Sequence, residues 1–186
     1  MHLHITGACG SGTSTLGRAL AAELGAAFIE ADDIFWRPSD PPFQTIRPAE
    51  ERLALLRAAF AHHPDSVVSG SVYGWGPEVE DAFDGIVFLY LDAALRVQRL
   101  REREQALYGK VIPEFLEWAA QYDAGPPRGR SLARQNAWLA ARSCPVLRLE
   151  GDLSTGQRLA RIRQWLQTPG VKPAHGPCPH SGTTPT

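Results

Sequence analysis

Five short apolar runs are separated by stretches in which apolar residues recur every three or four positions. The apolar runs cover residues 2–6, 27–31, 66–70, 85–91 and 145–150. Most are apolar along their whole length, as in GIVFLYL at 85–91. Such uninterrupted runs are typical of strands buried on both faces, as in a parallel sheet covered by helices. The pattern therefore predicts five parallel strands.

The intervening stretches have the periodicity of amphipathic helices. Leu16, Leu20 and Leu24 recur at four-residue spacing, and Gly25 follows as a helix stop. Further helical patterns are RPAEERLALLRAAFAHHP at 47–64, with Pro48 placed for a first turn, DAALRVQRLREREQAL at 92–107 and STGQRLARIRQWLQ at 154–167. Strands alternating with helices imply βαβ units with right-handed crossovers. We therefore expect a three-layer α/β/α sandwich around a five-stranded parallel sheet.

The length of 186 residues fits a single domain, and 44% hydrophobic residues can fill its core. We assign residues 1–167 to that domain. Residues 168–186 are rich in Pro, Gly and Thr and are expected to form a flexible tail. About fifty residues with three helical segments separate the fourth and fifth strands. Residues 104–130, approximately, are expected to form a helical lid, although an ordinary insertion packed on the sheet edge fits the length as well.

Composition narrows the choice of partners and compartment. The formal net charge is −1, and no basic stripe with interleaved aromatic residues is present, so we expect no nucleic acid partner. No apolar stretch approaches membrane-spanning length. The three cysteines lack metal or redox spacing, which favours a reducing, cytoplasmic location. The oligomeric state cannot be inferred from the sequence.

The segment HITGACGSGTSTLGRAL at 4–20 carries the clearest chemistry. Gly7, Gly12 and Ser14 fit the pattern G-x-x-x-x-G-x-[ST] between a predicted strand and a predicted helix. Glycines let backbone N–H groups wrap a phosphate, and the helix N-terminus adds positive potential. The alternative is a strand-to-helix turn without a ligand. The predicted nucleotide-binding residues are Gly7, Cys9, Gly10, Ser11, Gly12, Thr13, Ser14 and Thr15.

Two hydroxyl groups and one missing lysine refine this prediction. We expect Ser14 to coordinate Mg²⁺ bridging the terminal phosphates, and Thr15 to contact the inner phosphate. Thr13 occupies the position at which such loops normally carry a lysine that follows the transferred phosphoryl group. Its absence should weaken catalysis more than binding, because neutralising charge in the transition state is the larger part of that lysine's role. Either another cation substitutes or turnover is slow.

Four segments resemble small P-loop kinases of the nucleoside monophosphate kinase and shikimate kinase type. They are the loop at 4–20, EADDIFW at 30–36, VVSGS at 67–71 and FLYLDAALRVQRLRER at 88–103. A loop without lysine, G-x-G-T-x-T, is similar to that of archaeal-type cytidylate kinases. DDIFWRP at 32–38 and EFLEWAAQY at 114–122 resemble adenylate-kinase-like topology modulation proteins. The resemblance covers residues 1–167 and implies a P-loop NTPase fold with a helical lid insertion.

The resemblance also implies roles for residues beyond the loop. Arg99 and Arg103 match lid arginines that contact the base and the ATP phosphates, and Gly151 matches the loop that recognises the base. Asp33, favoured over Asp32, matches a carboxylate that orients the acceptor hydroxyl or holds Mg²⁺ through water. The candidates for the missing cation are Arg103, Lys110, Arg128, Arg130 and Arg134.

These observations lead to three hypotheses about function. The first is a kinase that transfers the γ-phosphoryl group of ATP or GTP, with Mg²⁺, to a nucleoside monophosphate or another small hydroxyl acceptor. The second is a nucleotide-binding regulator with a catalytically weakened loop, which Thr13 favours. The third is a slow NTP hydrolase. No residue pattern identifies the acceptor.

Overall fold

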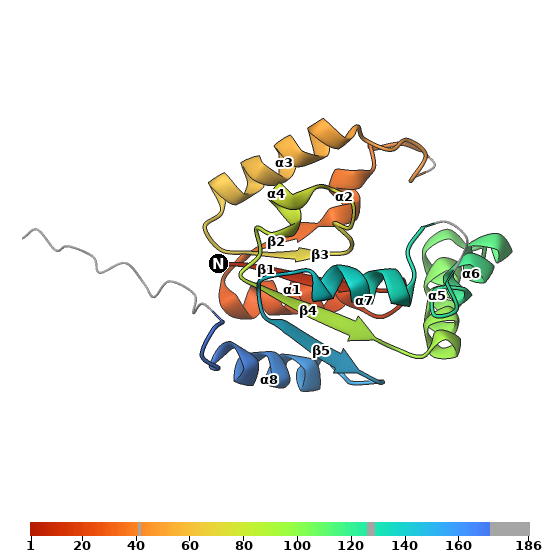
Figure 1. Ribbon diagram of the computed structural model, residues 1–186. Helices are drawn as coiled ribbons and strands as arrows, with labels where there is room; N and C mark the ends of the chain where they lie inside the picture. Colours follow the sequence, from red (N-terminus) through yellow and green to blue (C-terminus); the bar gives the residue numbers. More distant parts are fainter. Residues whose placement is uncertain (41, 126–128, 172–186) are drawn as a thin grey trace, which may run out of the picture.

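The computed structural model describes residues 1–40, 42–125 and 129–171 (Figure 1). Five parallel strands form one sheet in the order β2-β3-β1-β4-β5. Their bounds are β1 His2–Gly7, β2 Ala27–Glu30, β3 Ser66–Ser69, β4 Gly85–Tyr90 and β5 Val146–Glu150. Each lies within about one residue of the predicted run, so the predicted strands and the three-layer architecture are confirmed.

Helices cover both faces of this sheet. Their bounds are α1 Thr13–Leu24, α2 Ala31–Phe35, α3 Ala49–His62, α4 Pro77–Glu80, α5 Ala93–Tyr108, α6 Pro113–Ala120, α7 Leu132–Ala140 and α8 Thr155–Leu166. The short helices α2 and α4 were not predicted, because four or five residues are too few to show a helical period.

Alternate residues of the central strands build two separate cores. Val87 and Leu89 of β4 face a cluster with α1 and α8, in which Leu20 and Ile162 are fully buried. Their neighbours Ile86 and Phe88 face a second cluster with α3, α4 and α7. Because side chains alternate between the two faces of a strand, continuous apolar runs supply both cores at once.

Local signals in the sequence set several helix ends. Gly25 ends α1 in the left-handed conformation, with φ of 64°. The Asp92 carboxylate accepts a hydrogen bond from the Ala94 N–H at 2.9 Å and so caps α5. Ser154 and Gln157 form a reciprocal capping box at the start of α8.

The segment between β4 and β5 divides into two parts. Helix α7 packs on one face of the sheet, and there the Trp138 indole N–H donates a hydrogen bond to the Glu80 carboxylate at 2.6 Å. Helix α6 packs on α5 at the end of the molecule to which the strand arrows point (Figure 1). The buried Arg96 guanidinium joins these helices, donating to the Ala119 carbonyl and to Asp123.

Two further predictions concern the C-terminal tail and membrane-spanning segments. Most of the predicted tail, residues 172–186, lies outside the described residues. Within the described part, Val171 is buried and its N–H donates to the Thr168 carbonyl. None of the helices in the described ranges has the length and apolar character needed to cross a membrane.

A buried histidine makes the stability of the sheet depend on pH. His4 is fully buried in β1, stacks on Phe83, and is bonded through Nδ1 to the Val68 carbonyl. Burial lowers the pKa of His4 from 6.5 to about 4. Between these values the unfolded chain binds a proton that the folded chain does not, so the stabilising contribution is complete above pH 6.5 and is lost as the pH falls toward 4.

We predict that His4→Asn, which keeps a donor for the Val68 carbonyl, reduces this acid sensitivity. Relative to the variant, the wild type should lose up to about 3 kcal/mol of unfolding free energy between pH 7 and pH 4. Urea unfolding at several pH values measures the difference. His62→Asn on the exposed end of α3 is the control and should track the wild type. Parallel pH profiles for wild type and His4→Asn would refute the assignment.

Candidate active site

The loop between β1 and α1 is shaped by close packing. A Cβ atom on Gly7 would lie 2.5 Å from the Leu89 carbonyl oxygen, and one on Gly10 would lie 2.6 Å from the Arg96 carbonyl oxygen. Gly10 and Gly12 also have positive φ values of 82° and 93°. Only glycine satisfies these positions without strain, so the glycines predicted from the sequence are required by the backbone itself.

The loop ends in an uncapped helix N-terminus. Gly12 precedes α1 and offers no side-chain cap, and the first turn of α1 contains no acidic residue. The first N–H groups of a helix lack partners within the helix, so the first turn of α1 presents free donors and positive potential to the loop. The buried Ser11 hydroxyl likewise has no hydrogen-bond partner among the described residues. This arrangement is suited to binding an anion.

Ser14 faces a carboxylate that the sequence analysis did not single out. The Ser14 hydroxyl lies near the carboxyl group of Glu30, the last residue of β2. Burial raises the pKa of Glu30 from 4.5 to about 7, and Asp32 adds to that rise, while the Ser14 hydroxyl and Arg18 act against it. The signal for Glu30 in the sequence is its position at the end of an apolar strand, a position that it shares with the adjacent Asp32 and Asp33.

Asp32 lies opposite two of the predicted arginines. Although Asp32 retains contact with solvent, burial by surrounding protein raises its pKa, and the nearby Arg130 and Arg103 guanidinium groups oppose that shift. Arg130 also donates to the Cys9 sulfur of the loop at 3.4 Å. Arg103 and Arg130, about thirty residues apart in the chain, are thus brought to the same carboxylate beside the loop.

The other predicted residues are more dispersed. Arg99 donates to Asp152 at 2.5 Å, so it meets the turn that contains Gly151. Arg134 donates to the Gly129 carbonyl and is exposed. Asp33 and Lys110 make no hydrogen bond or ion pair within the described ranges. Arg128 lies outside those ranges.

A buried arginine of α8 was missed by the sequence analysis. Arg158 is 4% exposed, and its Nη1 donates to the Ser11 carbonyl of the loop at 2.9 Å. The sequence shows Arg158 only as one of several arginines in an amphipathic helix. Its contact with the loop depends on how α8 crosses α1, which no local pattern reports.

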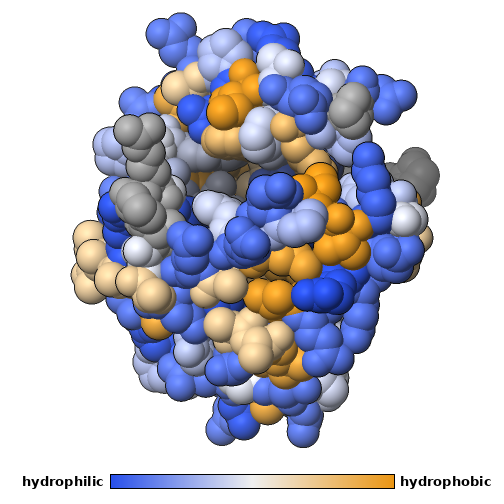
Figure 2. Space-filling model, turned by 90° about the vertical axis from the view of Figure 1, so that its right-hand side faces the viewer, coloured by the Kyte–Doolittle hydropathy of each residue, from blue (hydrophilic) through white to orange (hydrophobic). Residues whose placement is uncertain are grey.

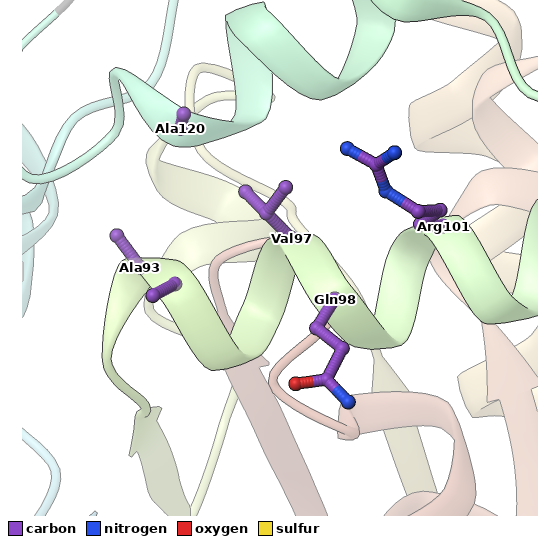
Figure 3. A pocket seen from close by; sticks show the side chains of 6 residues that line it. Ala93, Val97, Gln98, Arg101 and Ala120 are labelled. Carbon is purple, nitrogen blue, oxygen red and sulfur yellow. The ribbon is translucent and has the colours of Figure 1, made fainter.

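The face at the carboxyl ends of the strands is hollowed in its upper half (Figure 2). A separate groove of about 420 Å³ runs between α5 and α6 and is lined largely by Ala93, Val97 and Ala120 (Figure 3). That groove contains none of the loop residues, so the loop chemistry, rather than this groove, defines the site. In the part of the chain that the structure describes, no three His, Cys, Asp or Glu side chains form a metal-binding group.

Comparisons with known proteins find the same fold in a solved structure and related sequences in bacteria. No protein-family model matches the chain. The crystal structure of shikimate kinase from Bacteroides thetaiotaomicron superposes with a TM-score of 0.59 at 19% identity, covering 90% of this chain and 99% of that one. Shikimate kinase 2 of Sodalis glossinidius is 53% identical over 70 residues, which are 38% of this chain and 40% of that enzyme.

The five-stranded parallel sheet, its flanking helices and the glycine loop define a P-loop protein with the shikimate kinase fold. The uncharacterized protein YqaC of Bacillus subtilis is 36% identical over 177 residues, covering 90% of this chain and 98% of YqaC. The chain belongs to the same family as YqaC.

The raised pKa of Glu30 predicts a second pH effect on stability. Between pH 4.5 and pH 7 the folded state binds more protons at Glu30 than the unfolded state does, so this contribution to stability is lost as the pH rises through that window. Between pH 5 and pH 8, the unfolding free energy of the wild type should fall by about 1–3 kcal/mol relative to that of Glu30→Gln. EDTA is present so that bound metal ions do not contribute. Urea unfolding measures this difference. The exposed α3 variant Glu50→Gln is the control, and identical pH profiles for wild type and Glu30→Gln would contradict the prediction.

Proposed function

We propose that this protein is a small-molecule kinase that transfers the γ-phosphoryl group of ATP or GTP to a hydroxyl group of a small acceptor. The single observation that carries the proposal is the grouping at the carboxyl edge of the sheet. There the anion-binding loop, the Ser14–Glu30 pair and Asp32 lie beside Arg103 and Arg130. Phosphoryl transfer needs positioning and charge neutralisation more than covalent chemistry, and these groups supply both.

The donor set fits a magnesium ion bound with the nucleotide. Mg²⁺ prefers oxygen ligands and usually takes only one or two from the protein, with phosphate and water oxygens completing its coordination. The Ser14 hydroxyl and the Glu30 carboxylate, which lie near each other, are the groups that would hold it. When bound, the ion would neutralise charge on the terminal phosphates.

The acceptor is proposed to bind on the α2 and α3 side of the loop. Sequence resemblance supports Asp33 as the carboxylate that orients the acceptor hydroxyl, whereas the electrostatic coupling of Asp32 to Arg130 and Arg103 supports Asp32. The buried Nε of Arg52 has no partner among the described residues, and its guanidinium group lies over Phe35 and Trp75. An unpaired guanidinium favours an acceptor that carries a carboxylate or phosphate.

We further propose that residues 104–130, approximately, act as the lid. Arg103 at its base and Arg130 and Arg134 beyond it would close on the phosphates, with Arg99 and Gly151 beside the base of the nucleotide. Closure would exclude water, which otherwise competes with the acceptor for the phosphoryl group.

Thr13 supports a second candidate function, a nucleotide-binding regulator that retains the loop but transfers phosphate poorly. A transfer assay separates the two. Purified protein, Mg²⁺ and ATP or GTP are incubated separately with nucleoside monophosphates, shikimate-like hydroxy acids, sugar acids and water. We expect turnover with one hydroxyl acceptor well above the rate with water. Nucleotide binding without transfer to any acceptor supports the regulator, and transfer to water alone supports an NTP hydrolase.

Once an acceptor is found, the two aspartates can be distinguished. Asp32→Asn should lower kcat roughly 10²–10⁴-fold if Asp32 assists removal of the hydroxyl proton. Asp33→Asn should then leave most of kcat. Steady-state kinetics on both variants give the answer, and a larger loss for Asp33→Asn would assign the role to Asp33 instead.

The arginines should act mainly on turnover. Arg103→Gln and Arg130→Gln remove charge near the transferring group, so kcat should fall about 10²-fold or more while nucleotide affinity changes less. The exposed Arg101→Gln on the same helix as Arg103 is the matched control and should retain activity. Full turnover in both site variants would exclude these residues as the substitute cation.

A further inference from the structure

Arg158 is a buried cation without a matching anion. Its Nη1 is bonded to the Ser11 carbonyl, but its buried Nε and Nη2 have no hydrogen-bond partner among the described residues. The Asp152 carboxylate acts to raise the pKa of Arg158, but it is already paired with Arg99. Burial, and then the charge of Arg99, lower the pKa of Arg158, so both effects disfavour the charge that the side chain carries.

Such an arrangement lowers the stability of the ligand-free protein. A buried charge that is not compensated is among the most unfavourable features in a folded chain, and buried donors without partners add to the penalty. Replacing such a group with an apolar side chain of similar size is often neutral or stabilising. Arg158 therefore contributes little net stability, and none of the carboxylates in the described residues forms an ion pair with it.

The position of the Arg158 guanidinium beside the loop indicates where a compensating anion would bind. The Arg158 Nη1 lies 3.0 Å from the position that a Cβ atom on Gly12 would occupy. The guanidinium group thus packs against the Ser11–Gly12 peptide, immediately before the N-terminus of α1. Position 13, where a lysine would bring positive charge to the same turn, is a threonine.

We propose that Arg158 supplies, from behind the loop, the fixed positive charge that Thr13 does not, and so stabilises the polyphosphate of a bound nucleotide. This inference rests on the proposed function to the extent that the loop binds nucleotide. The Ser11 bond holds the guanidinium in place, so it acts through space on the bound anion and does not follow the phosphoryl group. Arg158 therefore affects nucleotide affinity by electrostatic attraction, in contrast to the arginines proposed to act on turnover.

The test uses the full chain, ATP and Mg²⁺, with calorimetry for affinity and thermal unfolding for stability. We expect Arg158→Met to bind ATP at least about tenfold more weakly, because one charge near the phosphates is lost in a partly buried site. The melting temperature of the ligand-free variant should be unchanged or higher. Arg158→Lys, which keeps a charge, should stay within about threefold of wild type.

A rescue experiment separates an electrostatic role from a structural one. Introducing Thr13→Lys into Arg158→Met should restore most of the ATP affinity, because the new ammonium group returns charge to the same turn. A residue that only supported the loop through its Ser11 bond would lower the melting temperature when removed and would not be rescued by that lysine. Arg161→Met, on the exposed face of α8, is the matched control and should bind as wild type does.

The outcomes are distinct. Equal ATP affinity of wild type and Arg158→Met overturns this inference and leaves the proposed function standing. Weaker binding with a lower melting temperature and no rescue also overturns it, assigning Arg158 a structural role. No ATP binding by the wild type overturns the proposed function and this inference together.

Discussion

The architecture depends on the close packing of the end of β1 and the following loop against β4 and α5. Gly7 pairs with Leu89 of β4, and the space beside it is too small for a side chain. Gly10 is similarly close to the backbone of α5. The loop is therefore confined between a strand and a helix, and its positive-φ glycines must turn the chain directly into α1. This confinement places the N-terminus of α1 at the carboxyl edge of the sheet, where ligands of open α/β sheets bind.

Two ionisable side chains whose surroundings oppose their charged form lie near the N-terminus of α1. Glu30 is held in surroundings that favour its neutral form, and Arg158 in surroundings that disfavour its charge. Elsewhere, buried charges are matched: Arg96 is paired with Asp123 and two carbonyl groups, and Glu80 with Trp138 and Arg142. Ionisable groups held in surroundings that oppose their charged form are common at functional sites, so the contrast favours the loop and its neighbours as the site.

The sequence predicted the sheet, its longer helices and the loop because each depends on local information. Apolar runs define buried strands, and Asp92 and Ser154 mark helix starts through hydrogen bonds within three residues. The partners of the loop could not be found in this way. Glu30 meets Ser14 only after β2 and α1 are placed, and Arg158 reaches Ser11 across 147 residues of chain. The neighbouring residues in the sequence favour Asp33, whereas the coupling of Asp32 to Arg130 appears only in three dimensions.

The replacement of lysine by threonine has a consequence beyond a missing charge. A lysine in this loop combines two tasks, holding the ground-state phosphates and following the phosphoryl group during transfer. Interactions of equal strength in both states improve binding, and only those that strengthen in the transition state accelerate the reaction. Arg158 lies on α8, whereas Arg103 lies on α5 and Arg130 precedes α7. Under the proposed roles, the two tasks would be divided between residues on different elements. Affinity and turnover should then respond to substitution independently, which a loop lysine would not permit.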